Sequence, residues 1–266
     1  MAVLCSTSLY SNSTIEKAIN RISELGFDSI DLLVIDGWVH VNTKDLVKEY
    51  NNTISKVEAL LSTYNIKPIA VNSAVSSQLH HRSVEVNKQR IEETKALVAF
   101  MKYFNIKFAA IQPRNPDSTR HWKAIIDDCV ETLKEQKAIG DSEGITFALE
   151  FHINSPFETM EQIKYFTQLM PEMPIVYDPS HFAMQGIDIK ETEWILDKAV
   201  HIHLRDASEG KMQVPVGKGK VDFHWLLSRL VTKNYCGHIS IEYLETKDFD
   251  AELEVLKLSE IISKYL

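Results

Sequence analysis

Short apolar runs alternate with longer amphipathic segments along the whole chain. The apolar runs are predicted as eight β-strands, at residues 3–9, 29–34, 67–72, 108–112, 146–150, 175–178, 201–204 and 238–243. The segments between them carry apolar residues at a spacing of three to four, which is typical of amphipathic helices. Eight strands, each followed by a helix, favour a closed (β/α)8 TIM barrel.

The amphipathic segments also show where helices begin and end. One apolar stripe consists of Ile15, Ala18, Ile19, Ile22 and Leu25, and a second consists of Ile54, Val57, Leu60 and Leu61. Ser13 or Thr14 is a candidate cap for the first of these helices, and Gly26 is a plausible stop. The longest predicted helix covers residues 117–142 and ends near Gly140 or Gly144.

An open, doubly wound sheet is the competing architecture. It normally has five or six strands and a glycine-rich first turn, whereas the turn after the first strand predicted here contains no glycine. The chain of 266 residues is close to the length typical of the barrel. It shows no linker, low-complexity tract or shift in composition. We therefore expect one domain over residues 1–266.

Composition and charge exclude several classes of protein. Subtracting 37 acidic from 29 basic residues gives a net charge of −8, and no lysine or arginine run exceeds two residues, so a nucleic-acid partner is not expected. No apolar segment reaches the length of a membrane helix, and the chain starts without a signal-peptide pattern. Cys5, Cys129 and Cys236 form no CxxC pair. We expect a cytoplasmic protein with reduced thiols and no membrane partner.

The candidate chemistry lies at the ends of the last four predicted strands, which end in Glu150, Asp178, His203 and Glu242. In a parallel barrel, functional residues gather at the carboxyl ends of the strands. A buried carboxylate is costly unless it is paired or bound to a metal, and one divalent cation satisfies three carboxylates at once. These four residues are therefore predicted to bind one divalent metal ion.

The donor set narrows the choice of metal. Three carboxylates suit Mn²⁺ or Mg²⁺, while the imidazole also admits Zn²⁺, Co²⁺ or Fe²⁺. No cysteine belongs to the set, so a structural zinc site is not expected. Each residue also has an ordinary structural interpretation. A single glutamate can form a loop salt bridge, His181 can cap a helix, and His201 is expected to be structural.

Several other polar or aromatic residues are candidates for the rim of the site. Asn72 and Gln112 end the third and fourth predicted strands and are candidate substrate ligands. Trp38, His40 and Trp122 are rim candidates for which ordinary packing explains the residue equally well. The loop at residues 217–220 contains two glycines whose N–H groups suit a phosphate, but we favour a tight turn into a helix capped by Asp222.

The order of these residues resembles the xylose isomerase-like TIM-barrel superfamily, in particular its sugar phosphate isomerase/epimerase branch. The motifs that carry the resemblance are Glu150, Asp178-Pro179-Ser180-His181, His203 and Glu242, with the segments 149–152, 201–206 and 215–223. The match spans all eight strand–helix units and is strongest from residue 145 onward.

The resemblance implies roles for individual residues. Glu150, Asp178, His203 and Glu242 would hold the cation, and Glu150 and Glu242 would also act as the acid/base pair on opposite faces of the substrate. His152 and His181 would face the substrate or orient ligands. The arginine that ketose epimerases of this branch place six residues after the metal histidine is Glu209 here, which leaves Arg205 or Lys211 as its replacement.

We therefore expect a metal-dependent isomerase or epimerase that acts on a sugar, a sugar phosphate or a related polyol through an enediolate. The alternatives are a metal-dependent lyase (dehydratase) of a cyclitol or keto acid, an apurinic/apyrimidinic endonuclease-like phosphodiesterase, and a non-catalytic binding protein. Relatives in this branch often pair, so a homodimer or homotetramer is also expected.

Overall fold

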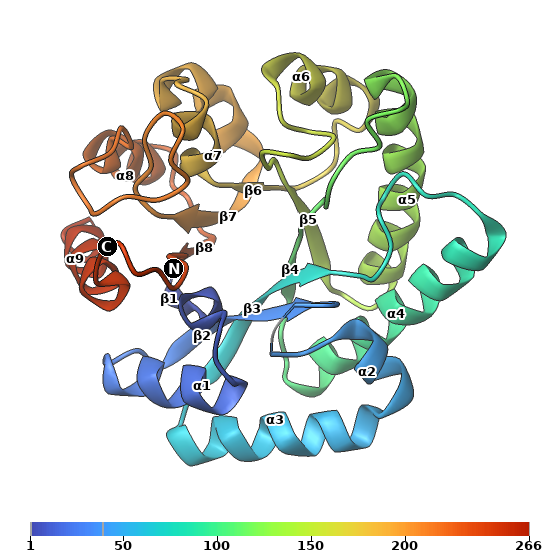
Figure 1. Ribbon diagram of the computed structural model, residues 1–266, viewed down its shortest axis with the longest axis horizontal. Helices are drawn as coiled ribbons and strands as arrows, with labels where there is room; N and C mark the ends of the chain where they lie inside the picture. Colours follow the sequence, from blue (N-terminus) through green and yellow to red (C-terminus); the bar gives the residue numbers. More distant parts are fainter. Residues whose placement is uncertain (1, 39, 266) are drawn as a thin grey trace.

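Eight parallel strands close into a barrel in the computed structural model of the protein (Figure 1). The structure describes residues 2–38 and 40–265, so Met1, Val39 and Leu266 of the predicted domain lie outside the described residues. Each strand pairs with the next, and β8 pairs with β1. The strands are β1 (Val3–Ser6), β2 (Ser29–Ile35), β3 (Lys67–Ala74), β4 (Phe108–Ile111), β5 (Thr146–Glu150), β6 (Ile175–Tyr177), β7 (Ala199–Leu204) and β8 (His238–Ile241). The prediction of a single-domain (β/α)8 TIM barrel is confirmed.

Helices follow the strands and surround the barrel (Figure 1). They are η1 (Thr7–Tyr10), α1 (Ile15–Glu24), α2 (Thr43–Lys48), α3 (Tyr50–Tyr64), α4 (Val84–Tyr103), α5 (Trp122–Ser142), α6 (Met160–Leu169), α7 (Pro179–Met184), η2 (Ile189–Lys198), α8 (Phe223–Thr232) and α9 (Ala251–Ser263), where η marks a 3₁₀ helix. The last helix, α9, contacts both β1 and β8 and so covers the point where the barrel closes.

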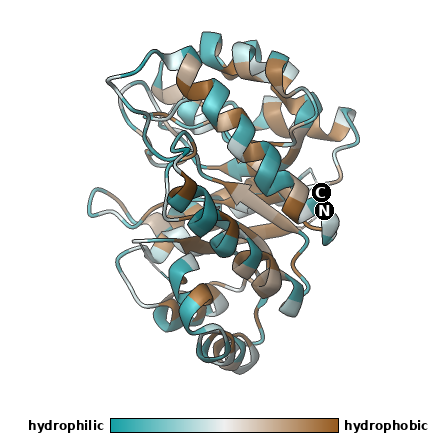
Figure 2. Cartoon of the chain, turned by 90° about the vertical axis from the view of Figure 1, so that its right-hand side faces the viewer, coloured by the Kyte–Doolittle hydropathy of each residue, from teal (hydrophilic) through white to brown (hydrophobic). Residues whose placement is uncertain are grey.

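The main core lies between the strands and the helices. It includes the buried stripe Ile15, Ala18, Ile19 and Ile22 of α1, which packs inward as the apolar spacing predicts. Figure 2 shows hydrophilic and hydrophobic residues side by side along the helices, while the strands behind them are mostly hydrophobic. All seven residues of β2 are buried, because both faces of a barrel strand are covered.

A second, smaller apolar core lies inside the barrel itself. Its buried members are Leu4, Ala70, Phe108, Ala110, Ala148 and Val176. Three of them are alanines contributed by β3, β4 and β5, and Ala110 pairs with both Asn72 and Ala148 across the sheet. The ring of Phe108 stacks on His201 with 4.6 Å between ring centroids. The apolar part of the barrel interior therefore borders on the polar side chain of His201.

Helix ends follow local signals in α1 and α8. Thr14 caps α1 by accepting a hydrogen bond from the N–H of Lys17, and Gly26 follows this helix with a φ of +88°. Asp222 accepts from the N–H of Trp225 and caps α8. These three predicted helix ends are confirmed.

Two predicted boundaries were wrong by more than two residues. The first strand ends at Ser6 rather than at residue 9, because the Ser6 hydroxyl accepts from the N–H of Ser8 and starts η1. The long helix begins at Trp122 rather than at residue 117, because the Asp117 carboxylate holds a local turn by accepting from the N–H and hydroxyl of Thr119.

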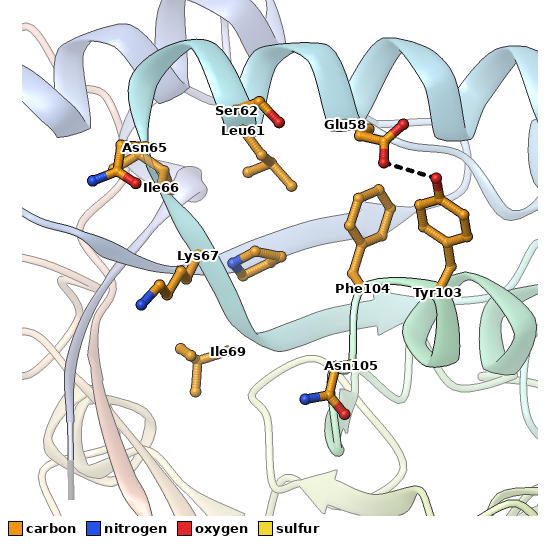
Figure 3. Close-up of a pocket in the computed structure, with 11 residues that line it drawn as sticks. Glu58, Leu61, Ser62, Asn65, Ile66, Lys67, Ile69, Tyr103, Phe104 and Asn105 are labelled. Atoms are coloured by element: carbon orange, nitrogen blue, oxygen red, sulfur yellow. Dashed lines mark hydrogen bonds between the residues drawn. The ribbon is translucent and has the colours of Figure 1, made fainter.

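A hollow of about 500 Å³ opens at the end of the barrel where the strands begin (Figure 3). It lies between the ends of α3 and α4 and is lined in part by Ile69 and Phe104. At its edge the Tyr103 hydroxyl donates to Oε1 of Glu58 at 2.8 Å. The hollow is thus separate from the carboxyl ends of the strands, where the predicted site lies. Within the described residues, no helix is both long enough and apolar enough to cross a membrane.

Candidate metal centre

The four predicted metal ligands meet inside the mouth of the barrel. Glu150 is the last residue of β5, His203 lies in β7, and Asp178 and Glu242 directly follow β6 and β8. All four are buried, and one donor atom from each lies within 4.8 Å of the donor atoms of the others. The structure therefore brings together the complete set that the strand ends predicted.

Two glutamates approach the same nitrogen of His203. Nδ1 of His203 lies 2.8 Å from Oε1 of Glu150 and 3.3 Å from Oε2 of Glu242. The other oxygen of Glu150, Oε2, is buried and has no hydrogen-bond partner among the described residues. Burying a carboxylate oxygen without a partner costs free energy, so a bound metal ion or substrate is expected next to Glu150.

Asp178 is placed by the start of α7. Its Oδ1 accepts from the N–H of Ser180 at 2.8 Å, and Pro179 occupies the first turn, where its missing N–H costs nothing. Its Oδ2 accepts from Nη2 of Arg205 at 2.8 Å. The sequence Asp-Pro-Ser-His thus ends a strand and caps a helix in the same step.

Arg205 is buried among the acidic side chains. Its Nη1 lies 3.0 Å from the carbonyl oxygen of Glu242 and 3.3 Å from Oε2 of that residue, while its Nε donates to the Ser180 hydroxyl at 2.9 Å. The guanidinium therefore balances charge and fixes two of the candidate ligands. A role for Arg205 in substrate binding stays a prediction.

The remaining predicted substrate ligands lie at different depths. His152 and His181 stand with their ring centroids 4.0 Å apart, and each has a donor atom within 4.8 Å of Glu150. Asn72 donates to Oε1 of Glu242 at 2.8 Å. Gln112 directly follows β4 and is half-buried. Three of the four thus contact or adjoin the metal-ligand candidates.

Sequence reasoning did not select Asp31 of β2. Its Oδ2 lies 3.1 Å from Nε2 of His201 and 3.1 Å from Nε2 of His203, and all three side chains are fully buried. His201, expected to be structural, is held between Asp31 and Phe108. Period-two alternation places Asp31 on one face of its strand, but it does not show that β7 supplies the partners.

The charges in this cluster explain the direction of its pKa shifts. Burial alone would raise the pKa of Glu242, but His203 and Arg205 hold that pKa down at about 2. For Asp178, burial raises the pKa above its ordinary value although Arg205 opposes the shift. Burial favours a neutral His203, but Glu242 and Glu150 raise the pKa of its imidazole well above the usual value.

The donor set fits a divalent cation. Three carboxylates and one imidazole converge from separate strands, which matches the oxygen-rich sets of Mn²⁺ and Mg²⁺ and equally the mixed sets of Zn²⁺. A divalent charge would also relieve the repulsion among the acids.

The glycine loop at residues 217–220 forms a turn around a carboxylate of the protein itself. Oδ2 of Asp206 accepts from the N–H groups of Gly217 at 2.8 Å and of Gly219 at 3.0 Å, while its Oδ1 accepts from Val221 at 3.3 Å. The N–H groups that suited a phosphate are therefore already paired. The structure agrees with the turn rather than the phosphate cradle.

The aromatic rim candidates differ in exposure. Trp38 is 43% exposed, and Nδ1 of His40 lies 3.0 Å from the Thr7 hydroxyl. Trp122 packs edge-on against Tyr165 of α6 and lies beside His121. Ordinary packing accounts for Trp122.

Comparison with known proteins gives a consistent picture. Residues 19–259 match the family described as xylose isomerase-like TIM barrel. The chain is similar to the inosose isomerase of Halalkalibacterium halodurans, with 24% identity over 91% of this chain and 87% of the relative. It is also similar to L-ribulose-5-phosphate 3-epimerase UlaE of Shigella boydii serotype 18, with 22% identity over 88% and 83%.

A solved structure shares the whole fold. The IOLI protein with a binding zinc atom aligns with a TM-score of 0.75 and 21% identity, covering 100% of this chain and 99% of that one. The agreement extends over the complete barrel and includes the half that carries the four candidate ligands.

Proposed function

Since the chain belongs to the xylose isomerase-like TIM barrel family, we propose that it is a divalent-metal-dependent isomerase or epimerase of a small sugar, sugar phosphate or related polyol. The observation that supports this most directly is the convergence of Glu150, Asp178, His203 and Glu242 within 4.8 Å in the mouth of the barrel. The two curated relatives, an isomerase and an epimerase, favour the same reaction class.

A divalent cation held by these residues would supply a Lewis acid for negative charge on the substrate oxygen next to the reacting carbon. Glu150 offers its unpartnered Oε2 as the base that removes a proton from that carbon. Glu242 follows β8, which lies three strands from β5 around the barrel. The two carboxylates can therefore serve different faces of one substrate.

The position of proton return decides the product. Return to the opposite face of the same carbon inverts it and gives an epimer, whereas return to the neighbouring carbon moves the carbonyl and gives an isomer. Asn72 and Arg205 fix the Glu242 carboxylate by hydrogen bonds to Oε1 and Oε2, at 2.8 and 3.3 Å. A fixed orientation of the carboxylate is required if the proton is to be transferred at one particular carbon of the substrate.

We also assign His181 to orienting the substrate. Nη2 of Arg205 lies 3.4 Å from Nε2 of His181, and Oδ2 of Asp178 lies 3.5 Å from the same nitrogen. A guanidinium only donates, so we assign Nε2 as its acceptor and the ring proton to Nδ1. That Nδ1 is buried and has no partner within the described part of the chain. We assign it as a donor to a substrate oxygen, with His152 beside it at the more exposed side.

Isotope exchange tests the proposed acid/base pair. Glu150→Gln and Glu242→Gln should each lower the incorporation of solvent deuterium into substrate by about 10²-fold or more, because an amide cannot carry the proton. Inosose and L-ribulose 5-phosphate, taken from the names of the two relatives, are the first substrates to try with Mn²⁺-loaded protein. Exposed Glu172→Gln is the matched control and should exchange like the wild type.

Wild-type exchange in either site variant would refute the assignment. Product mass separates the reaction classes in the same experiment, because an isomerase or epimerase leaves the mass unchanged and a dehydratase removes one water.

A further inference from the structure

A buried carboxylate lies behind the proposed metal ligands. Asp31, in the middle of β2, is fully buried, and its Oδ2 is 3.1 Å from Nε2 of both His201 and His203. It does not belong to the set of four proposed ligands, because His203 stands between it and the two glutamates.

We propose that Asp31 is a positioning residue that fixes the ring of His203 for metal binding. When a metal binds, the imidazole must be neutral, and Asp31, by accepting the proton on Nε2, would leave the lone pair of Nδ1 for the cation beside Glu150 and Glu242. The inference rests on the proposed function, because it concerns the same metal centre.

The two ring nitrogens of His203 face different partners and are assigned different roles. Nδ1 faces the oxygens of Glu150 and Glu242 at 2.8 and 3.3 Å, whereas Nε2 faces Asp31. A neutral imidazole has one donor and one acceptor nitrogen. A carboxylate at Nε2 selects the tautomer in which this nitrogen carries the proton, so Nδ1 is left as the metal ligand.

His201 makes this arrangement rigid. It donates through Nε2 to the same oxygen of Asp31, and its ring is stacked on Phe108 below and lies edge-on to His203 with 5.1 Å between centroids. Asp31 is also anchored through its backbone, which pairs with Ser6 of β1. The carboxylate therefore has one well-defined orientation in which two imidazoles share Oδ2.

An ordinary structural role explains these contacts less well. Oδ1 of Asp31 is buried and has no partner among the described residues, so the carboxylate is not fully compensated where it lies. In an apolar barrel interior, a hydrocarbon side chain avoids that cost. The presence of an acid at this point is explained if its charge increases the basicity of a metal-binding imidazole.

Metal affinity tests the proposal without using catalytic activity. Apo-protein is titrated with Mn²⁺ by isothermal calorimetry, and Asp31→Asn, which keeps the size of the side chain and removes its charge, should bind Mn²⁺ about 10- to 100-fold more weakly than the wild type. Asp28→Asn is the matched control, because Asp28 is exposed directly before the same strand, and it should bind like the wild type. Thermal unfolding in EDTA verifies that each variant is folded.

The outcomes separate this inference from the proposed function. Wild-type protein that binds no Mn²⁺ contradicts the proposed function itself, whereas wild-type and Asp31→Asn affinities within twofold of each other overturn only the role of Asp31.

A second measurement uses the wild-type protein and does not depend on folding of the variant. Nitrogen-15 NMR of the Zn²⁺-loaded protein should show His203 with the metal on Nδ1 and the proton on Nε2. Zinc on Nε2, with the proton on Nδ1, would overturn the proposal.

Discussion

Glu150 and Glu242 have different surroundings although both lie at the same end of the barrel. Asn72 and Arg205 engage both oxygens of Glu242, whereas Oε2 of Glu150 is buried without a partner in the described structure. The proposed acid/base pair therefore consists of one carboxylate with a fixed orientation and one that retains an available oxygen. This asymmetry suits a reaction in which one group must adapt to the substrate.

His40 provides a prediction at the scale of a single residue. Burial lowers the pKa of its ring from 6.5 to about 4. Between these two pH values the unfolded chain binds a proton that the folded protein does not, so stability falls as the pH falls through this window. From pH 7 to 4.5 the loss from this group should be about 2 kcal/mol, and His40→Gln should remove it.

Urea unfolding of the wild type and His40→Gln at both pH values measures the difference. His224→Gln changes an exposed ring and serves as the control, which should keep the wild-type pH dependence. An equal loss of stability in the wild type and His40→Gln would show that His40 does not carry this part of the pH dependence.

At the scale of elements, the loop after β7 is organised by Asp206. Its two oxygens collect N–H groups from Gly217, Gly219 and Val221, and the loop then leads into α8. A β-carbon on Gly219 would overlap Oδ1 of Asp206 and the carbonyl oxygen of Ala207. Close packing therefore requires glycine at this position.

Two alanine substitutions in this loop should differ in cost. Gly219→Ala forces the Asp206 carboxylate away and should destabilise the protein by about 2–3 kcal/mol. Gly217→Ala meets open space, but its φ of +81° is strained for alanine, so about 1 kcal/mol is expected. Urea unfolding of both variants gives the comparison, and equal costs would argue against the close packing of Gly219 on Asp206.

The sequence predicts elements better than it predicts their partners. All eight strands were visible because their apolar runs are local, and carboxylates that end such runs identified Glu150, Asp178 and Glu242. The end of β1 was missed although its signal is local, because Ser6, whose hydroxyl accepts from the N–H of Ser8 and starts η1, lies inside the predicted run. Asp31 was not selected because its partner His203 is 172 residues away in the sequence.

At the scale of the whole molecule, closure of the barrel is what assembles the site. β2 and β7 are not neighbours in the sheet, yet both point side chains into one interior, so Asp31 reaches His203 across the barrel. On β3, β4 and β5 the interior core next to this site contains the small side chains of Ala70, Ala110 and Ala148. The proposed metal centre therefore depends on closure of the barrel and not on a single strand–helix unit.

Anomalous diffraction from a crystal soaked in Mn²⁺ tests the central claim most directly. The account predicts an anomalous peak in the mouth of the barrel that is ligated by Glu150, Asp178, His203 and Glu242 together. A map without a peak at that position, or with these four side chains turned away from one another, would contradict it.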